Sequence, residues 1–303
     1  MMTDIAVALG GGGIKGIAHV GALQKLVEAG YTIKAVAGTS AGGIVGAMIA
    51  AGYSPDDLKE ILLTMNQGNL FKRKPDEGPA LLGLSGLTDI LTEKLGSMKF
   101  DELKIPYAST AVDLITSQEL VINRGSVIDA VLATVAVPGV FPPREIGQYR
   151  FIDGGVLDPV PVSVVRWLNP DLPIVAICLS PEPAKWSELT SFRLPVTNSL
   201  VGPIVDQINR LRIGQAVQIF LRSLEITDRM LAEIRMQNEK PDAIVRPDVE
   251  RFGILDNVDP LVLMEEGAKA MEAKLPEIQK ATQWVSQVQR KLTQKKQTVR
   301  TME

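Results

Sequence analysis

The stretch IKAVAGTSAGGIVGAMIAA, residues 33–51, decides the fold class of this chain. Residues 33–37 form a short apolar run, which is typical of a strand buried on both faces of a sheet. Residues 43–51 are small or apolar, as in a closely packed helix. The pentapeptide Gly38-Thr39-Ser40-Ala41-Gly42 joins the two parts. The stretch therefore predicts a strand, a sharp turn and a helix, which is the repeating unit of an α/β protein.

The chain on both sides of this stretch continues the same alternation. Residues 5–9 are an apolar run, four glycines follow as a turn, and a helical pattern runs from residue 17 to about residue 29. Further strands are predicted at residues 106–114, 119–122, 149–152, 174–179 and 243–246, and further helices at residues 127–137, 199–236 and from 260 to beyond 292. We therefore expect a three-layer α/β/α fold with a central, mostly parallel sheet and a helical C-terminal part.

The composition is that of a globular protein without extreme charge. Of the 303 residues, 46% are hydrophobic and 22% are charged, and the formal net charge is -3. We expect one domain over residues 1–285, followed by a basic, polar tail over residues 286–303 that frays. Such a chain lacks a global basic field, so nucleic acid is not an expected partner. The oligomeric state is not encoded in any pattern of the sequence.

Targeting signals and disulfides are not indicated. The single cysteine, Cys178, lies in an apolar run and can form no internal disulfide. The N-terminus lacks the basic start and the small-residue cleavage site of a signal peptide, and no stretch approaches the roughly 20 apolar residues of a membrane-spanning helix. We expect a cytoplasmic protein, with peripheral membrane contact as an option.

One histidine, His19, is present in the whole chain. Any Ser-His-Asp triad would have to use it, and a His-rich metal site is excluded. With a single cysteine as well, we expect no metal and no cofactor. His19 lies on a helical stripe with Ala22, Leu23 and Leu26, a position that favours a buried, hydrogen-bonded structural role.

The pentapeptide around Ser40 matches the pattern G-x-S-x-G, and it lies between a predicted strand and a predicted helix, the context in which the pattern has meaning. Small residues on both sides allow a sharp turn from which the serine side chain projects. The partial positive charge of a helix N-terminus favours a developing alkoxide. The alternative is a tight turn whose serine caps the helix.

A glycine loop precedes this unit by one helix and one strand. Backbone amides exposed in residues 10–16, GGGGIKG, could stabilise the oxyanion of an acyl-transfer reaction. The competing interpretation is a phosphate-binding loop, because Gly11, Gly13 and Gly16 satisfy G-x-G-x-x-G. Against a dinucleotide site, the acidic residue expected after the second strand is missing. The Walker pattern also fails, because Lys15 precedes Gly16.

These motifs together resemble those of the patatin-like phospholipases. The glycine loop, the G-x-S-x-G pentapeptide and Asp153-Gly154-Gly155 follow one another in the family's order, and the resemblance covers residues 5 to about 180 strongly and 200–270 loosely. It implies a Ser-Asp dyad, which needs no histidine, with Ser40 as nucleophile and Asp153 as its partner. It also implies a nucleophile elbow at Gly38 and Gly42 and an oxyanion hole at Gly11, Gly12 and Gly13.

Asp153 is not singled out by its local sequence. The residues alone favour an aspartate that stabilises a turn, and Asp158 and Asp113 are the next candidates. An ordinary aspartate, with a pKa near 3.9, is a poor base at neutral pH, so the dyad requires a burial that raises this pKa. Many family members carry asparagine where this chain has Pro159, which leaves the local hydrogen bonding there open.

The resemblance implies a serine acyl hydrolase that cleaves fatty-acyl esters of phospholipids or lysophospholipids through an acyl-enzyme. Two alternatives stay open: an acyl thioesterase or acyltransferase on soluble carriers, and a nucleotide-binding module that uses the glycine loop. A lipid substrate also implies a transient membrane surface as partner. Residues 69–87 and 186–200 combine apolar side chains with chain breaks, so they are candidates to dock there, or else ordinary surface loops.

Overall fold

The computed structural model describes residues 3–74, 78, 80–188, 212–283 and 297–302. Within them, eight strands form one sheet in the order β5-β6-β3-β2-β1-β7-β8, with β4 paired to β3. Neighbours in one half run parallel, namely β3 (Tyr107–Asp113), β2 (Tyr31–Gly38), β1 (Thr3–Leu9), β7 (Ile174–Ile177) and β8 (Ala243–Val245). The antiparallel strands are β4 (Gln118–Ile122), β6 (Tyr149–Asp153) and β5 (Arg144–Ile146). The mostly parallel central sheet confirms the predicted fold class.

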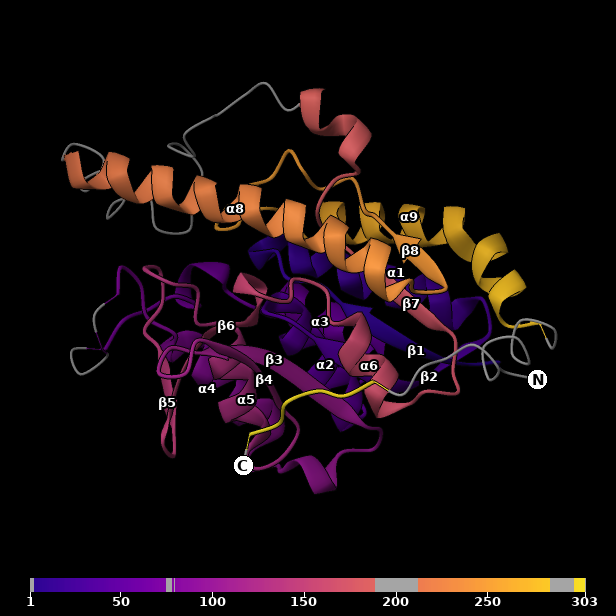
Figure 1. Ribbon diagram of the computed structural model, residues 1–303, viewed down its shortest axis with the longest axis horizontal. Coiled ribbons are helices and arrows are strands. Elements are labelled where there is room, and N and C mark those ends of the chain that lie inside the picture. Colours follow the sequence, from indigo (N-terminus) through magenta and orange to yellow (C-terminus); the bar gives the residue numbers. More distant parts are fainter. Residues whose placement is uncertain (1–2, 75–77, 79, 189–211, 284–296, 303) are drawn as a thin grey trace.

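Helices cover both faces of this sheet (Figure 1). The larger core lies on the face covered by α1 (Ile17–Glu28), α2 (Ala41–Ala51), α3 (Pro55–Thr64), α4 (Ser85–Leu95), α5 (Val127–Thr134) and α9 (Pro260–Ala281). A second core lies under α6 (Val162–Leu168) and the C-terminal half of α8 (Arg212–Glu239). Alternate residues of β1 serve the two cores, because successive side chains of a strand point to opposite faces.

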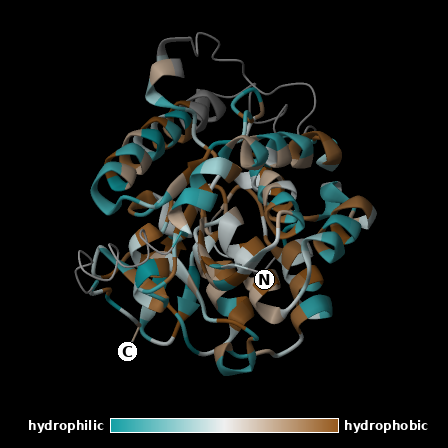
Figure 2. Ribbon diagram, turned by 90° about the vertical axis from the view of Figure 1, so that its right-hand side faces the viewer, coloured by the Kyte–Doolittle hydropathy of each residue, from teal (hydrophilic) through white to brown (hydrophobic). Residues whose placement is uncertain are grey.

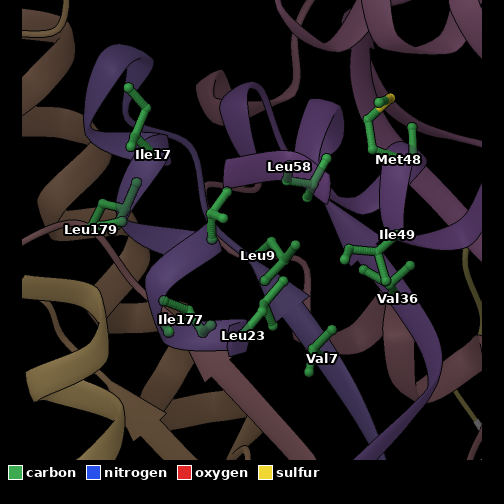
Figure 3. Packing of buried hydrophobic residues seen from close by; sticks show 14 of the residues in the cluster. Val7, Leu9, Ile17, Leu23, Val36, Met48, Ile49, Leu58, Ile177 and Leu179 are labelled. Carbon is green, nitrogen blue, oxygen red and sulfur yellow. The ribbon is translucent and has the colours of Figure 1, made fainter. Parts of the chain in front are cut away.

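Packing in the larger core follows directly from this alternation. Val7 and Leu9 of β1 lie with Leu23 of α1 and Ile177 of β7 in the larger core (Figure 3). Ala6 and Ala8 belong to the second core. In Figure 2 the hydrophobic residues gather toward the sheet and the inner sides of the helices. The two apolar runs read from the sequence are therefore central strands buried on both faces.

Several short elements were not predicted from the sequence, and some predicted helix boundaries differ from those in the structure. Helices α3, α4 and α6 and strand β5 were not expected from periodicity. Helix α2 begins at Ala41, directly after Ser40, and α5 ends at Thr134, before Pro138. Of the expected C-terminal helices, residues 199–211 and 284–292 lie outside the described residues. Among the described helices, none is both long enough and apolar enough to cross a membrane.

The described end of the C-terminal tail departs from the expected fraying. The Val121 amide donates to the carbonyl oxygen of Arg300 at 2.7 Å, and the Met302 amide donates back to Val121 at 3.3 Å. Val299 packs against the second core and Met302 against the sheet. These two apolar side chains supply the contact that a purely polar tail would lack. Residues 286–296 lie outside the described part, so fraying there stays a prediction.

Close contact between α1 and α9 fixes the helix that follows the glycine loop. A Cβ atom at Gly21 would lie 1.9 Å from the carbonyl oxygen of Met264, and one at Gly267 would lie 1.9 Å from that of Ala18. Only glycine permits so close a backbone approach at these two positions. The start of α1, and with it the loop, is thereby held against the C-terminal part of the chain.

Candidate active site

Ser40 lies on a sharp elbow between β2 and α2. Its backbone has φ 53° and ψ −123°, a conformation that residues other than glycine rarely adopt, and 7% of its surface is exposed. The elbow requires glycine on either side. A Cβ atom at Gly42 would lie 2.1 Å from the carbonyl oxygen of Leu9, and one at Gly38 would lie 2.3 Å from that of Gly42. The pentapeptide is therefore a strained turn that projects a serine, the geometry of a nucleophile elbow.

Neighbouring elements hold this elbow through hydrogen bonds. The Ser40 amide donates to the Thr134 hydroxyl at 2.9 Å, at the end of α5. The Thr39 hydroxyl donates to the carbonyl oxygen of Asp158 at 2.8 Å and lies 2.7 Å from the Thr110 hydroxyl. A Ser40 that only capped α2 would accept a bond from an amide of that helix, but its side chain makes no capping bond. Hydrogen bonds with β3, α5 and the segment after β6 thus hold the strained turn in place.

Asp153 ends β6 beside Ser40. Its Oδ1 atom accepts a hydrogen bond from the Gly155 amide at 2.7 Å, and the Ser40 hydroxyl lies close enough to this carboxyl group to lower its pKa. Burial raises the pKa of Asp153 to about 6, although the bonds from Ser40 and Gly155 work in the opposite direction. The carboxylate is therefore ionised at neutral pH, and it is a stronger base than an exposed aspartate.

The other two aspartates have different surroundings. Burial would raise the pKa of Asp113, but hydrogen bonds from Arg150, Thr116 and Ile115 outweigh it and lower this pKa. Asp158 is fully buried 3.6 Å from an Arg235 nitrogen, and it touches the elbow only through its backbone carbonyl. Of the three candidates, only Asp153 has a carboxyl group that meets the side chain of Ser40.

The glycine loop lies directly against the serine. A Cβ atom at Gly11 would lie 3.3 Å from Cβ of Ser40. The Gly11 amide already donates to the carbonyl oxygen of Pro159 at 3.0 Å. In the described part of the chain, the amides of Gly12 and Gly13 have no hydrogen-bond partner. These two amides are therefore the available donors of the predicted oxyanion hole, whereas Gly11 packs against the nucleophile.

A further free amide next to the nucleophile was not predicted from the sequence. Ala41 starts α2 directly after Ser40, and among the described residues its amide has no partner. In nucleophile elbows, the amide that follows the nucleophile is commonly an oxyanion donor. The G-x-S-x-G pattern itself carried this signal.

His19 has the structural role that its helical stripe suggested. Its ring is fully buried, and Nε2 lies 2.8 Å from the carbonyl oxygen of Gly10. Burial lowers the pKa of His19 to about 4, so the ring is neutral at physiological pH and Nε2 donates this bond. The side chain fixes the first glycine of the loop and makes no described contact with Ser40.

A pocket of about 340 Å³ opens from Ser40 and Asp153. Its walls are mainly apolar side chains, among them Ile44, Met48, Ile61, Leu87, Phe141 and Leu224. Its polar end holds the glycine loop with Lys15, Ser180 and three charged residues of α8, which are Glu225, Asp228 and Arg229. Periodicity did not reveal the charged contribution of α8, because it depends on how that helix crosses the sheet.

The segments considered for membrane docking are only partly described. Leu70 and Phe71 line the pocket, and Leu82, Leu84 and Leu87 are buried. The apolar residues of this segment therefore serve the interior, while Lys72, Arg73 and Lys74 are exposed. In the second segment, residues 189–200 lie outside the described residues.

A strained serine beside a buried carboxylate and a glycine loop, all at the ends of sheet strands, is an arrangement typical of serine esterases on α/β folds. Comparison with known proteins gives the family. Residues 7–166 match the model of the Patatin-like phospholipase family, and the chain belongs to this family.

Several relatives are similar to this chain over part of its length. An uncharacterized NTE family protein of Mycobacterium tuberculosis is 35% identical over 172 residues, which cover 56% of this chain and 48% of that protein. Patatin-like phospholipase domain-containing protein 7 of Mus musculus is 27% identical over 169 residues, covering 54% of this chain and 12% of that protein. The chain thus spans about half the length, or less, of these curated relatives.

A solved structure shares the fold at low sequence identity. VipD from Legionella pneumophila superposes with a TM-score of 0.56 at 13% identity, covering 91% of this chain and 67% of that one. The likeness extends across both halves of the chain, including regions beyond the family match. It supports the architecture and does not assign a substrate.

Proposed function

We propose that the protein is a serine hydrolase that cleaves fatty-acyl esters of phospholipids or lysophospholipids. The observation that carries this proposal is Ser40 on its strained elbow, with the Asp153 carboxylate against it, at the opening of an apolar pocket. Family membership supports a lipid substrate. We assign the whole catalytic apparatus to a single domain over residues 1–285.

The reaction proceeds in two halves with balanced proton transfers. Asp153 accepts the Ser40 hydroxyl proton as Oγ attacks the acyl carbon, and the amides of Gly12, Gly13 and Ala41 stabilise the oxyanion. The carbon–oxygen bond to the leaving alcohol then breaks, and Asp153 returns the proton to that alcohol. In the second half, water takes the place of the alcohol: Asp153 accepts its proton, the fatty acid leaves, and Ser40 regains its hydrogen.

The pocket favours a long acyl chain. A pocket of about 340 Å³ falls in the size range of small-molecule sites, and apolar walls gain free energy by removing methylene groups from water, about 0.8 kcal/mol for each group. The glycine loop opens into this apolar space. The amides of Gly10 and Gly11 donate to the carbonyl oxygens of Ile177 and Pro159, so these two amides are not available to a phosphate. This supports ester chemistry over nucleotide binding. A lipid substrate implies transient contact with a membrane surface.

The test is covalent labelling by a fluorophosphonate, followed by mass spectrometry of the labelled peptide. We expect modification at Ser40 and at no other serine. Rates on phospholipid vesicles should then exceed rates on soluble acyl thioesters of the same chain length. If the thioesters react faster, the alternative of a thioesterase or acyltransferase on soluble carriers takes the place of a phospholipase. Nucleotide binding without labelling would reject both.

Ile44→Trp should change the preferred chain length. Ile44 follows Ser40 by one helical turn and lines the pocket, so a tryptophan there fills the space next to the nucleophile. We expect rates on esters of 12 to 16 carbons, chosen as roughly pocket-filling chains, to fall about 100-fold, while acetyl esters change less than about threefold. A series of p-nitrophenyl esters measures this.

Ile44→Val is the matched control, because it removes one methyl group and leaves the pocket open. It should keep the wild-type preference. An equal loss on short and long esters in Ile44→Trp would indicate damage to the elbow, and an unchanged long-chain rate would place the acyl chain elsewhere.

A further inference from the structure

The pocket contains a second carboxyl group, half-buried and on a different element from the first. Asp228 lies on α8, the long helix that crosses the upper part of the molecule in Figure 1. Its Oδ2 atom accepts a hydrogen bond from the Ser180 hydroxyl at 3.2 Å, in the segment that follows β7. Asp228 lines the same pocket as Ser40 and Asp153.

Gly155 brings the two carboxyl groups together. A Cβ atom at this position would lie 3.1 Å from Oδ1 of Asp153 and 3.6 Å from Oδ1 of Asp228. The Gly155 amide also donates to Oδ1 of Asp153. Both carboxyl groups therefore lie against the same glycine, close enough for the charge on one to act on the other.

The charges around Asp228 decide when it ionises. Burial is the largest influence and raises the pKa of Asp228 to about 7. The hydrogen bond from Ser180 lowers this pKa and the negative charge of Asp153 raises it. The positive charge of Lys15 also lowers it, and the negative charge of Glu225 raises it. Asp153, which has two donors of its own, loses its proton first. At mildly alkaline pH the pocket therefore holds two carboxylates, and Lys15 of the glycine loop interacts electrostatically with the second one.

We propose that Asp228 is a positioning residue for the hydrolysis proposed above, and that its negative charge makes Asp153 a stronger base toward Ser40. A like charge at short range raises the proton affinity of a carboxylate. Asp228 approaches Asp153 across Gly155, while Lys15 offers a compensating positive charge on the side of the oxyanion donors. The inference rests on the proposed function, because it acts through the Ser40–Asp153 pair.

The experiment measures the rate constant of fluorophosphonate labelling between about pH 5.5 and pH 9. The wild-type rate should rise in two steps, the first with Asp153 and the second with Asp228. Asp228→Asn keeps a side chain of the same size that can bond to Ser180, and it should show the first step alone. The wild-type rate should be close to that of the variant at low pH and about tenfold higher at the alkaline end.

Ser180→Ala supplies an independent second variant. Loss of its hydrogen bond removes a stabilising donor from the Asp228 carboxylate, so the second step should move to higher pH. Circular dichroism and thermal unfolding establish that each variant is folded. If Asp228→Asn does not fold, the shift in Ser180→Ala decides alone.

The outcomes separate the two proposals. A rate ratio between wild type and Asp228→Asn that is the same at every pH would mean that Asp228 only packs, and it would overturn the inference. A second step that stays in place in Ser180→Ala would also overturn it. In either case labelling at Ser40 would leave the proposed function intact, whereas a wild-type protein that is not labelled at Ser40 would reject both.

Discussion

Ser40→Ala is expected to abolish fluorophosphonate labelling and to lower ester hydrolysis by about 10⁴-fold or more. The change removes the nucleophilic oxygen and keeps Cβ, so the elbow and the contact with Gly11 remain. No other serine can replace it, because Ser40 is the described serine that both lines the pocket and meets Asp153. Initial rates on a long-chain ester, with intact protein mass after labelling, measure the effect.

Ser223→Ala is the matched control, since Ser223 lies on α8 and its hydroxyl donates, among the described residues, only to the Ile219 carbonyl of the same helix. It should keep full labelling. Persistent labelling of Ser40→Ala at the wild-type rate would place the nucleophile at another residue and remove the basis of the proposed mechanism. Residual hydrolysis without labelling would indicate a contaminating esterase and not a second nucleophile in the chain.

The parts of the site that could be predicted are those encoded in a few adjacent residues. The elbow needs small residues at Gly38 and Gly42 and a serine between them, and the loop needs consecutive glycines. Both patterns lie between an apolar run and a helical pattern, so their places at strand ends followed from periodicity. The parallel pairing of β1 with β2 then brings the loop beside Ser40.

The rest depends on contacts between residues far apart in the chain. Asp153, Asp113 and Asp158 all lie near strand ends, and only the pairing of β6 with β3 decides which carboxyl group reaches Ser40. Which loop amides are free depends on the Pro159 carbonyl, which accepts the Gly11 amide. Asp228 reaches the pocket because α8 crosses it.

Hydrophobic periodicity was also misleading on α8. The helical spacing of the apolar residues that include Ile219 is typical of a face turned to the core, but Ile219 is 64% exposed, while Leu224 lines the pocket. A helix with apolar residues on more than one side gives a pattern that cannot tell the buried side from the exposed one. The position of α8 over the sheet, which its sequence does not encode, makes that choice.

Asp153→Asn is expected to lower kcat/KM by about 10³-fold and also to stabilise the folded protein at neutral pH. Asparagine can still accept the Gly155 amide bond but is not a base, so the loss of rate reflects missing proton transfer from Ser40. Initial rates on a long-chain ester measure the first effect. Wild-type activity in this variant would show that Asp153 is not the base.

The stability gain follows from the sign of the pKa shift. The pKa of Asp153 is about 6 in the folded protein and near 3.9 in an unfolded chain, so the folded state binds more protons between these values. The wild-type protein therefore loses stability as pH rises from about 4 to about 6, by about 3 kcal/mol at most. Asp153→Asn has no such proton to lose. Urea unfolding at both ends of this range should show the variant gaining on the wild type.

Asp171→Asn, at an exposed aspartate, is the control and should follow the wild-type pH dependence. A difference in unfolding free energy between Asp153→Asn and wild type that does not change with pH would contradict burial as the cause of the raised pKa. The rate and the unfolding measurements on Asp153→Asn therefore test the same cause, which is the burial of the Asp153 carboxylate. Removing the Asp153 carboxylate from water makes it a better base for Ser40, and the same desolvation weakens the fold, so activity and stability should change in opposite directions.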